Sequence, residues 1–190
     1  MSPGARPVAV DPGVVVVEQA GQSVMISNAA GEASASWQAM IGENTPRGLV
    51  HLGIGLARCG LAGARQSLAD AESAYRVAVA LGKSVVYYGD HWLSCLILQH
   101  RAQLEPLVAP AVKVLRHDPE LCRTLEAFLA ADGNLTATGK ALFVHPNTVG
   151  YRLKQFAQRA GVEPRSTSGV GLIQVALVSL QLDAASGTQS

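Results

Sequence analysis

Residues 134–161 read NLTATGKALFVHPNTVGYRLKQFAQRAG and contain two predicted helices that are separated by three residues. Asn134 is a favourable N-cap for the first, shorter helix. His145 and Pro146 open the second helix, because proline is favoured at the first helical position. Gly161 ends it, since glycine tolerates the left-handed conformation that follows many helices. Two helices joined by so short a turn predict a helix-turn-helix.

The second predicted helix has two chemically different faces. At ~100° per residue, its apolar positions share one side, which carries Val149, Leu153, Phe156 and Ala160. The other side has no carboxylate and presents amide, hydroxyl and ammonium groups from Asn147, Thr148, Tyr151, Lys154, Gln155 and Gln158. Such groups bond base edges and phosphates. This face therefore predicts binding in the major groove of DNA.

Positive charge is concentrated in the same part of the chain. Residues 134–165 contain five lysines and arginines and one acid, a local charge of +4, whereas the whole chain of 190 residues carries +1. A basic module of this kind suits a phosphate-binding face. The charge pattern alone also fits a solvated helix that binds nothing.

Two apolar helices are predicted on either side of this segment. Asp118 and Pro119 open one helix, whose buried stripe is Leu121, Leu125, Phe128 and Leu129. After the segment, apolar residues recur every three or four positions at Val170, Ile173, Ala176, Leu177 and Leu180. This repeat indicates either a helix that closes the core of the domain or a dimer interface, because periodicity does not separate the two.

The first half of the chain mixes strands and helices. The runs 14–17 and 23–27 predict a β-hairpin, 33–41 a weak helix, and 49–55 and 85–88 two strands. Between those strands, Ser67 and Asp70 resemble a capping box at the start of a helix that ends at Gly82. The pattern is helical from Asp90 onward, and two prolines within 101–116 interrupt it, which places a domain boundary there. The predicted fold class is α+β.

Residues 133–153 resemble the C-terminal helix-turn-helix of PucR/CdaR-type bacterial transcription regulators, and are also similar to the Fis-type motif. The specific core is His-x-Asn-Thr-x-x-Tyr-Arg-Leu, at His145, Asn147, Thr148, Tyr151, Arg152 and Leu153. The resemblance implies a DNA-binding transcription regulator with an all-helical domain at residues 117–184. Two positions differ from the family pattern. Gly150 stands where arginine is common and Gly139 where alanine is usual, and each mid-helix glycine costs up to ~1 kcal/mol.

The first half more weakly resembles the degenerate GGDEF-like domain that precedes this helix-turn-helix in CdaR-type regulators. The resemblance rests on Gly53-Ile54-Gly55, Gly60-Leu61, Ser67, the helix to Gly82, residues 85–88 and Asp90. It implies an α/β domain at residues 7–104, shortened at its N-terminus. A diguanylate cyclase needs acidic residues at the hairpin turn to hold metal ions, and residues 19–22 have none. We therefore expect a protein that is not an enzyme, and either a short regulator or a fragment of a longer one.

The polar face and the resemblance together give the expected DNA site. Residues 146–160 would read the major groove, with bases facing Asn147, Thr148 and Tyr151. Phosphates would meet Lys140, Arg152 and Lys154, with further contacts from Thr136 and Thr138. His145 would cap the second helix and touch the DNA backbone. The alternative, favoured by Gly150, is a small-molecule sensor or protein-interaction module whose helix-turn-helix no longer binds DNA.

Other features narrow the class of protein. Three widely spaced cysteines without a Cys-x-x-Cys pair argue against a disulfide framework and a thiolate zinc site. His91 and Cys95 have helical spacing but no further predicted ligands, so we expect no metal and no cofactor. The most apolar run, residues 170–182, is shorter than the ~20 residues of a membrane span. We expect a cytoplasmic homodimer that binds double-stranded DNA, with an unidentified small-molecule effector left open.

Overall fold

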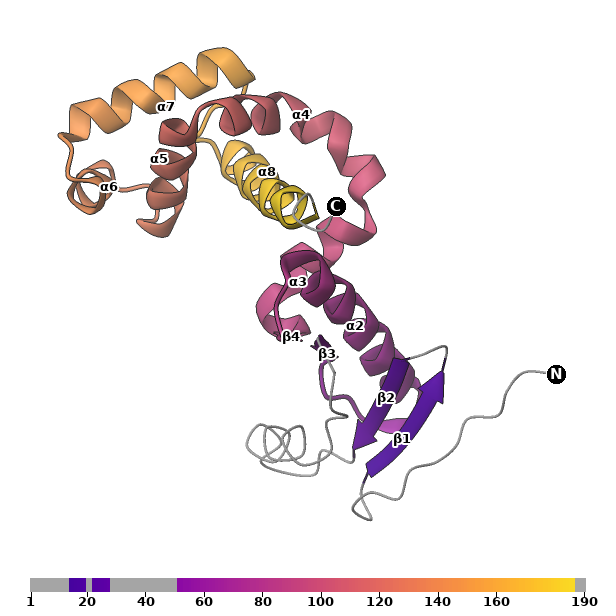
Figure 1. The fold of residues 1–190 in the computed structure, drawn as a ribbon. Helices are drawn as coiled ribbons and strands as arrows, with labels where there is room; N and C mark the ends of the chain where they lie inside the picture. The colour runs from indigo at the N-terminus through magenta and orange to yellow at the C-terminus, as the bar shows by residue number, and fades with distance from the viewer. Residues whose placement is uncertain (1–13, 20–21, 28–50, 187–190) are drawn as a thin grey trace. The chain divides into compact units, whose positions relative to one another are not determined.

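The computed structural model describes residues 14–19, 22–27 and 51–186 (Figure 1). The chain divides into two compact units, residues 1–50 and residues 51–190. In the first unit, β1 (Val14–Gln19) pairs antiparallel with β2 (Gln22–Ser27), and Val14 lies opposite Ser27. This pairing confirms the predicted hairpin. The weak helix predicted at 33–41 lies outside the described residues.

The second unit begins with a β-α-β passage. The strands β3 (Leu52–Ile54) and β4 (Val85–Tyr87) are parallel, and α2 (Gly60–Leu81) connects them. Glycine is required where β3 crosses α2. A Cβ atom at Gly53 would lie 2.1 Å from the Tyr75 nitrogen, and one at Gly55 would lie 2.0 Å from the Ser67 carbonyl oxygen. These two glycines therefore serve close strand-helix packing.

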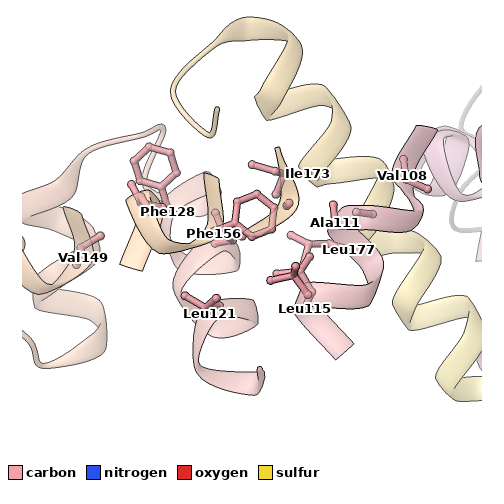
Figure 2. Close-up of a cluster of buried hydrophobic side chains, with 14 residues drawn as sticks. Val108, Ala111, Leu115, Leu121, Phe128, Val149, Phe156, Ile173 and Leu177 are labelled. Carbon is pink, nitrogen blue, oxygen red and sulfur yellow. The ribbon is translucent and has the colours of Figure 1, made fainter. Parts of the chain in front are cut away.

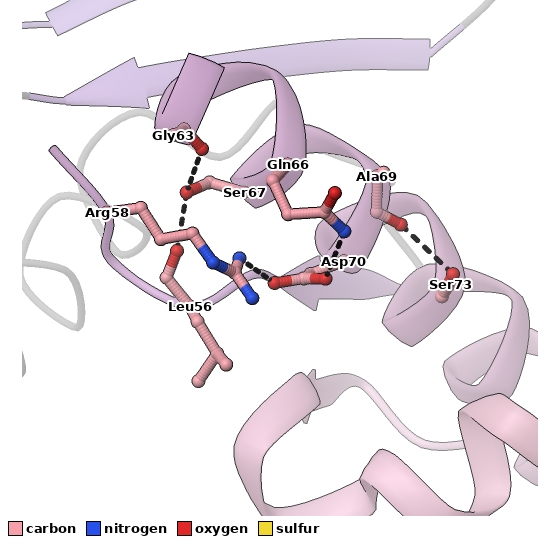
Figure 3. A network of polar contacts seen from close by, with 8 residues as sticks. All are labelled: Leu56, Arg58, Gly63, Gln66, Ser67, Ala69, Asp70 and Ser73. Atoms are coloured by element: carbon pink, nitrogen blue, oxygen red, sulfur yellow. Dashed lines mark hydrogen bonds and ion pairs between the residues drawn. The ribbon is translucent and has the colours of Figure 1, made fainter. Parts of the chain in front are cut away.

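The start of α2 differs from the sequence prediction. The helix begins at Gly60, and its N-cap, Cys59, makes no side-chain capping bond. The predicted cap, Ser67, lies inside the helix, where its hydroxyl donates to the carbonyl oxygens of Leu56 and Gly63 (Figure 3). Asp70, the predicted partner of Ser67, is buried and pairs with Arg58. The predicted stop at Gly82 is confirmed, with φ of 62°.

Two further helices follow the β-α-β passage. After β4 comes α3 (Tyr88–Gln99), which is kinked at His91, where φ of −119° and ψ of 20° are not helical. The stretch predicted to be interrupted is one helix, α4 (Arg101–His117), with Pro106 and Pro110 inside it. Each proline removes a backbone donor. The helix persists because its C-terminal half is anchored in the core, as described below.

The remaining chain forms four helices: α5 (Pro119–Ala130), α6 (Leu135–Leu142), α7 (Pro146–Ala160) and α8 (Thr167–Ser186). The predicted caps of α5 and α6 are confirmed. Asp118 accepts a hydrogen bond from the Leu121 nitrogen at 3.2 Å, and Asn134 accepts from Thr136 and Ala137 at 3.0 Å. The second unit is mostly helical, with one small parallel sheet.

The larger core joins α4, α5, α7 and α8 (Figure 2). Phe128, Val149, Leu153 and Phe156 share it, as the sequence predicted. Leu142, predicted to join them, is only half-buried at the end of α6 and lies outside this cluster. A second, smaller cluster contains Ala74, Val77, Ala78, Val86 and Cys95.

The helix α8 closes the larger core. Its Ile173, Ala176 and Leu177 are buried there, in agreement with one of the two interpretations of the C-terminal repeat. By length and composition alone, residues 167–184 of α8 would suffice to cross a membrane. The side of α8 that carries Ile173, Ala176 and Leu177 packs against the other helices of the larger core.

Candidate nucleic-acid interface

Helices α6 and α7 are joined by a tight turn of three residues. Phe143 has φ of 56°, a left-handed conformation that is uncommon for a residue other than glycine. The Val144 nitrogen donates to the Gly139 carbonyl oxygen at 2.9 Å, which closes the end of α6. A Cβ atom at Gly139 would lie 2.7 Å from the Val144 carbonyl oxygen. Gly139 therefore allows the turn to approach the helix closely.

The N-terminus of α7 is capped by a histidine. The Nδ1 atom of His145 accepts a hydrogen bond from the Asn147 backbone nitrogen at 3.2 Å, which confirms the predicted cap. Pro146 occupies the first turn, where its missing N–H costs nothing. The His145 side chain is exposed, so its Nε2 edge is available to a partner.

The two faces of α7 lie where the sequence predicted. Val149, Leu153, Phe156 and Ala160 are buried. On the other side, Tyr151 is 67% exposed, and Thr148 is half-buried. The remaining polar side chains of this face that are exposed are Asn147, Lys154 and Gln158. Neither α6 nor α7 contains a carboxylate.

The two threonines of α6 have different surroundings. Thr136 is exposed, as is Lys140 one turn further along the helix. Thr138 is fully buried, and its hydroxyl donates to the Asn134 carbonyl oxygen at 2.7 Å. This corrects the predicted role of Thr138, because its hydroxyl is occupied inside the domain and has no surface to offer a phosphate.

Arg152 also differs from its predicted role as a phosphate contact. Its guanidinium forms an ion pair with Glu120 at the start of α5 and donates to the Thr124 hydroxyl at 3.3 Å. The Arg152 side chain is only 15% exposed. It is turned toward α5, beside the polar face of α7 and not on it.

A second ion pair joins the same two helices. Arg159 donates to Asp118 at 2.7 Å. Burial alone would raise the pKa of Asp118, but the hydrogen bonds from the Leu121 nitrogen and from Arg159 outweigh it and lower that pKa. The sequence analysis missed both acids as partners of α7, since they lie 32 and 41 residues from the arginines they pair with.

The turn presents one further side chain that the sequence analysis did not single out. Phe143 is 96% exposed. It borders a shallow hollow together with Thr136, Gly139, Lys140, Val144 and Pro146. In the sequence, its one signal is that an aromatic residue directly follows the predicted end of a helix at Leu142.

Within the part of the chain that the structure describes, no three His, Cys, Asp or Glu side chains are grouped to hold an ion. Cys95 is buried, and burial raises the pKa of its thiol. His91 lies beside Lys83, and burial together with that charge lowers its pKa.

A short helix, a tight turn and a longer helix with an exposed polar face define a helix-turn-helix domain. Residues 121–178 match the family model of the PucR C-terminal helix-turn-helix domain. This match covers the described elements from α5 to most of α8, and it confirms the resemblance noted for residues 133–153.

Curated relatives match parts of the chain. An uncharacterized protein of Mycobacterium tuberculosis (strain ATCC 25618 / H37Rv) is 33% identical over 90 residues, 47% of this chain and 20% of the relative. The DNA-binding transcriptional activator AdeR of Bacillus subtilis (strain 168) is 36% identical over 52 residues, 27% of this chain and 12% of AdeR. The chain thus spans about a fifth or less of the length of these two relatives.

A solved structure is also similar. The crystal structure of a regulator of polyketide synthase expression from Bifidobacterium adolescentis is 29% identical. The similarity covers 66% of this chain and 54% of that one, with a TM-score of 0.42.

Proposed function

We propose that this protein binds double-stranded DNA through α6 and α7 and regulates transcription. The observation that carries the proposal is the face of α7 opposite its buried stripe, which is exposed, polar and free of carboxylates. It lies in a domain that matches the PucR C-terminal helix-turn-helix. The name of AdeR, a DNA-binding transcriptional activator that matches over 52 residues, supports the same function.

The proposed DNA site keeps seven of the nine predicted residues. Asn147, Thr148 and Tyr151 would face bases, and Lys140 and Lys154 would meet phosphates. Thr136, near the start of α6, would add a hydroxyl contact to the DNA backbone, where helix N-termini favour phosphate. His145 would add a contact through its free ring edge. Thr138 and Arg152 are left out because their polar groups are bonded within the domain.

We further propose two domains, at residues 7–104 and 117–184, with α4 spanning the division. The separation of the two apolar clusters, one before residue 100 and one after it, supports this division. The first domain would be GGDEF-like and non-catalytic, a proposal supported by the hairpin and the β-α-β passage. We also propose a cytoplasmic location and a homodimer as the DNA-binding form. The homodimer is proposed because one such domain offers few cationic contacts to DNA. A small-molecule effector is not identified.

The test of DNA binding is the salt dependence of affinity. With Lys140 and Lys154 as the cationic contacts, the slope of log K against log salt should be about −1.8 for a monomer and about −3.6 for a dimer, at ~0.9 per phosphate. Duplexes enriched from a random library by the purified chain provide the ligand, and fluorescence anisotropy gives the affinity. We expect the dimer slope and a protected inverted repeat with half-sites roughly 34 Å apart.

Two variants separate base contacts from phosphate contacts. Lys154→Ala should weaken binding to all duplexes similarly and flatten the slope by about 1.8 for a dimer. Asn147→Ala should relax preference at one base pair in each half-site, a loss of ~1–3 kcal/mol of discrimination. Unchanged binding by both variants would contradict the assigned face. A monomer in sedimentation that protects a single half-site would contradict the dimer.

The GGDEF-like part is expected to lack diguanylate cyclase activity. Gln19 is the last residue of β1, and Gln22 is the first residue of β2. Neither has a carboxylate to hold magnesium, and the two residues between them are not acidic either. The purified chain incubated with GTP and magnesium should give no cyclic dinucleotide by mass spectrometry. Product above the level of a heat-denatured control would show the expectation to be wrong.

A further inference from the structure

Arg152 lies in a small polar network between α7 and α5. Its guanidinium reaches the Glu120 carboxylate and the Thr124 hydroxyl. Thr124 is 1% exposed, and its hydroxyl donates to the Glu120 carbonyl oxygen at 2.7 Å while it accepts from Arg152. Arg152 and Thr124 are therefore hydrogen-bonded to partners inside the domain. Among the described residues, no buried side-chain nitrogen or oxygen lacks a hydrogen bond.

The network holds α7 on the side next to its DNA-facing side chains. Arg152 follows Tyr151 directly, so its side chain leaves the helix ~100° from the exposed tyrosine. Seven residues further along α7, Arg159 pairs with Asp118. Two ion pairs about two turns apart constrain the rotation of α7 about its axis and tie it to the N-terminal end of α5. The apolar stripe alone constrains that rotation less, because hydrophobic contacts are not directional.

We propose that the Glu120–Arg152 pair positions the recognition helix, so that an acidic residue of α5 increases affinity for DNA. This inference rests on the proposed DNA-binding function. Arg152 is here a positioning residue that acts through Glu120, and the side chains on the neighbouring face make the contacts. The role differs from a phosphate contact by the same arginine.

The two roles predict opposite signs for one substitution. Glu120 is 69% exposed, and its removal takes a negative charge away from a DNA-binding domain. If Arg152 contacted phosphate, Glu120→Gln would release the arginine from its ion pair and tighten DNA binding. If the pair positions α7, Glu120→Gln would weaken binding, although the domain becomes more positive.

The experiment compares variants of the whole 190-residue chain on the same duplex. We expect Glu120→Gln to weaken binding by about three- to tenfold, in the range of couplings within one hydrogen-bond network. The matched control is Glu126→Gln, which removes the same charge from an exposed position of α5, where the carboxylate accepts a 3.9 Å hydrogen bond from the Cys122 thiol. Its affinity should equal or exceed that of the wild type.

Substitution of the arginine provides a second readout. Arg152→Gln should weaken binding while the salt slope stays within about 0.3 of the wild type, whereas a lost phosphate contact flattens it by ~0.9 for each copy. Arg152→Lys should recover part of the affinity, because an ammonium still pairs with Glu120. Circular dichroism checks that each variant is folded. If Arg152→Gln does not fold, the affinity of Glu120→Gln alone decides between the two roles.

The outcomes distinguish this inference from the function on which it rests. Binding of no duplex by the wild type would remove the proposed function and the positioning role together. If the wild type binds DNA and Glu120→Gln binds it as tightly or more tightly, the positioning role alone would be overturned. A salt slope flattened by Arg152→Gln would also overturn it.

Discussion

Replacing Leu153 with alanine is expected to lower the free energy of unfolding by about 2–5 kcal/mol, the range for deletion of a buried leucine side chain. Leu153 is 3% exposed and lies in the core that α4, α5, α7 and α8 share. Alanine would leave a cavity there, because neighbours on four helices cannot all move inward. Urea denaturation followed by circular dichroism measures the loss.

Leu107 provides a matched control for this change. It is a leucine of α4, but it is 63% exposed. Leu107→Ala should therefore change stability by less than about 0.5 kcal/mol, as surface substitutions usually do. A loss below about 1 kcal/mol for Leu153→Ala would mean that the buried stripe of α7 is assigned to the wrong side, since a core leucine costs more.

The helix-turn-helix was predictable because its signals are local. The bounds of α6 and α7 follow from Asn134, from His145 with Pro146, and from Gly161, each of which acts on backbone groups within four residues. The phase of α7 followed from the spacing of its apolar residues. These are interactions that a short window of sequence contains, so the exposed positions of Asn147, Tyr151 and Lys154 were predicted correctly.

The errors arose where distant residues override a local pattern. Ser67 and Asp70 have the spacing of a capping box, but Asp70 pairs with Arg58 and the helix extends seven residues further back. Pro106 and Pro110 interrupt a helical pattern, but α4 continues through them because Val108, Ala111 and Leu115 are buried against other helices. In both cases tertiary contacts, which a local sequence pattern does not contain, decide where the helix begins or continues.

The same reason explains the two corrected site residues. The sequence places Arg152 close to the polar face of α7, and only the fold brings Glu120 and Thr124 against it. Thr138 lies on the short helix α6, and only the fold shows that it is buried while Thr136, two residues earlier, is exposed. A polar side chain therefore indicates a DNA contact only where the packing leaves its polar atoms without partners.

The two mid-helix glycines of the helix-turn-helix give the second large effect, with opposite signs. Neither has a positive φ, and helix propensity alone assigns both the same cost relative to alanine. At Gly139 a Cβ atom would lie 2.7 Å from the Val144 carbonyl oxygen, which is backbone and cannot rotate away. At Gly150 a Cβ atom would meet nothing within 4 Å.

Gly139→Ala should therefore destabilise the chain by about 1–3 kcal/mol, as overpacking does, although alanine favours the helix. Gly150→Ala should stabilise it by up to ~1 kcal/mol through helix propensity. Urea denaturation of both variants beside the wild type measures the two shifts. Stabilisation by Gly139→Ala would mean that the turn can move away from α6, and that the alanine usual in related sequences is compatible with this backbone. Destabilisation by Gly150→Ala would mean that a neighbouring group lies against that side of α7.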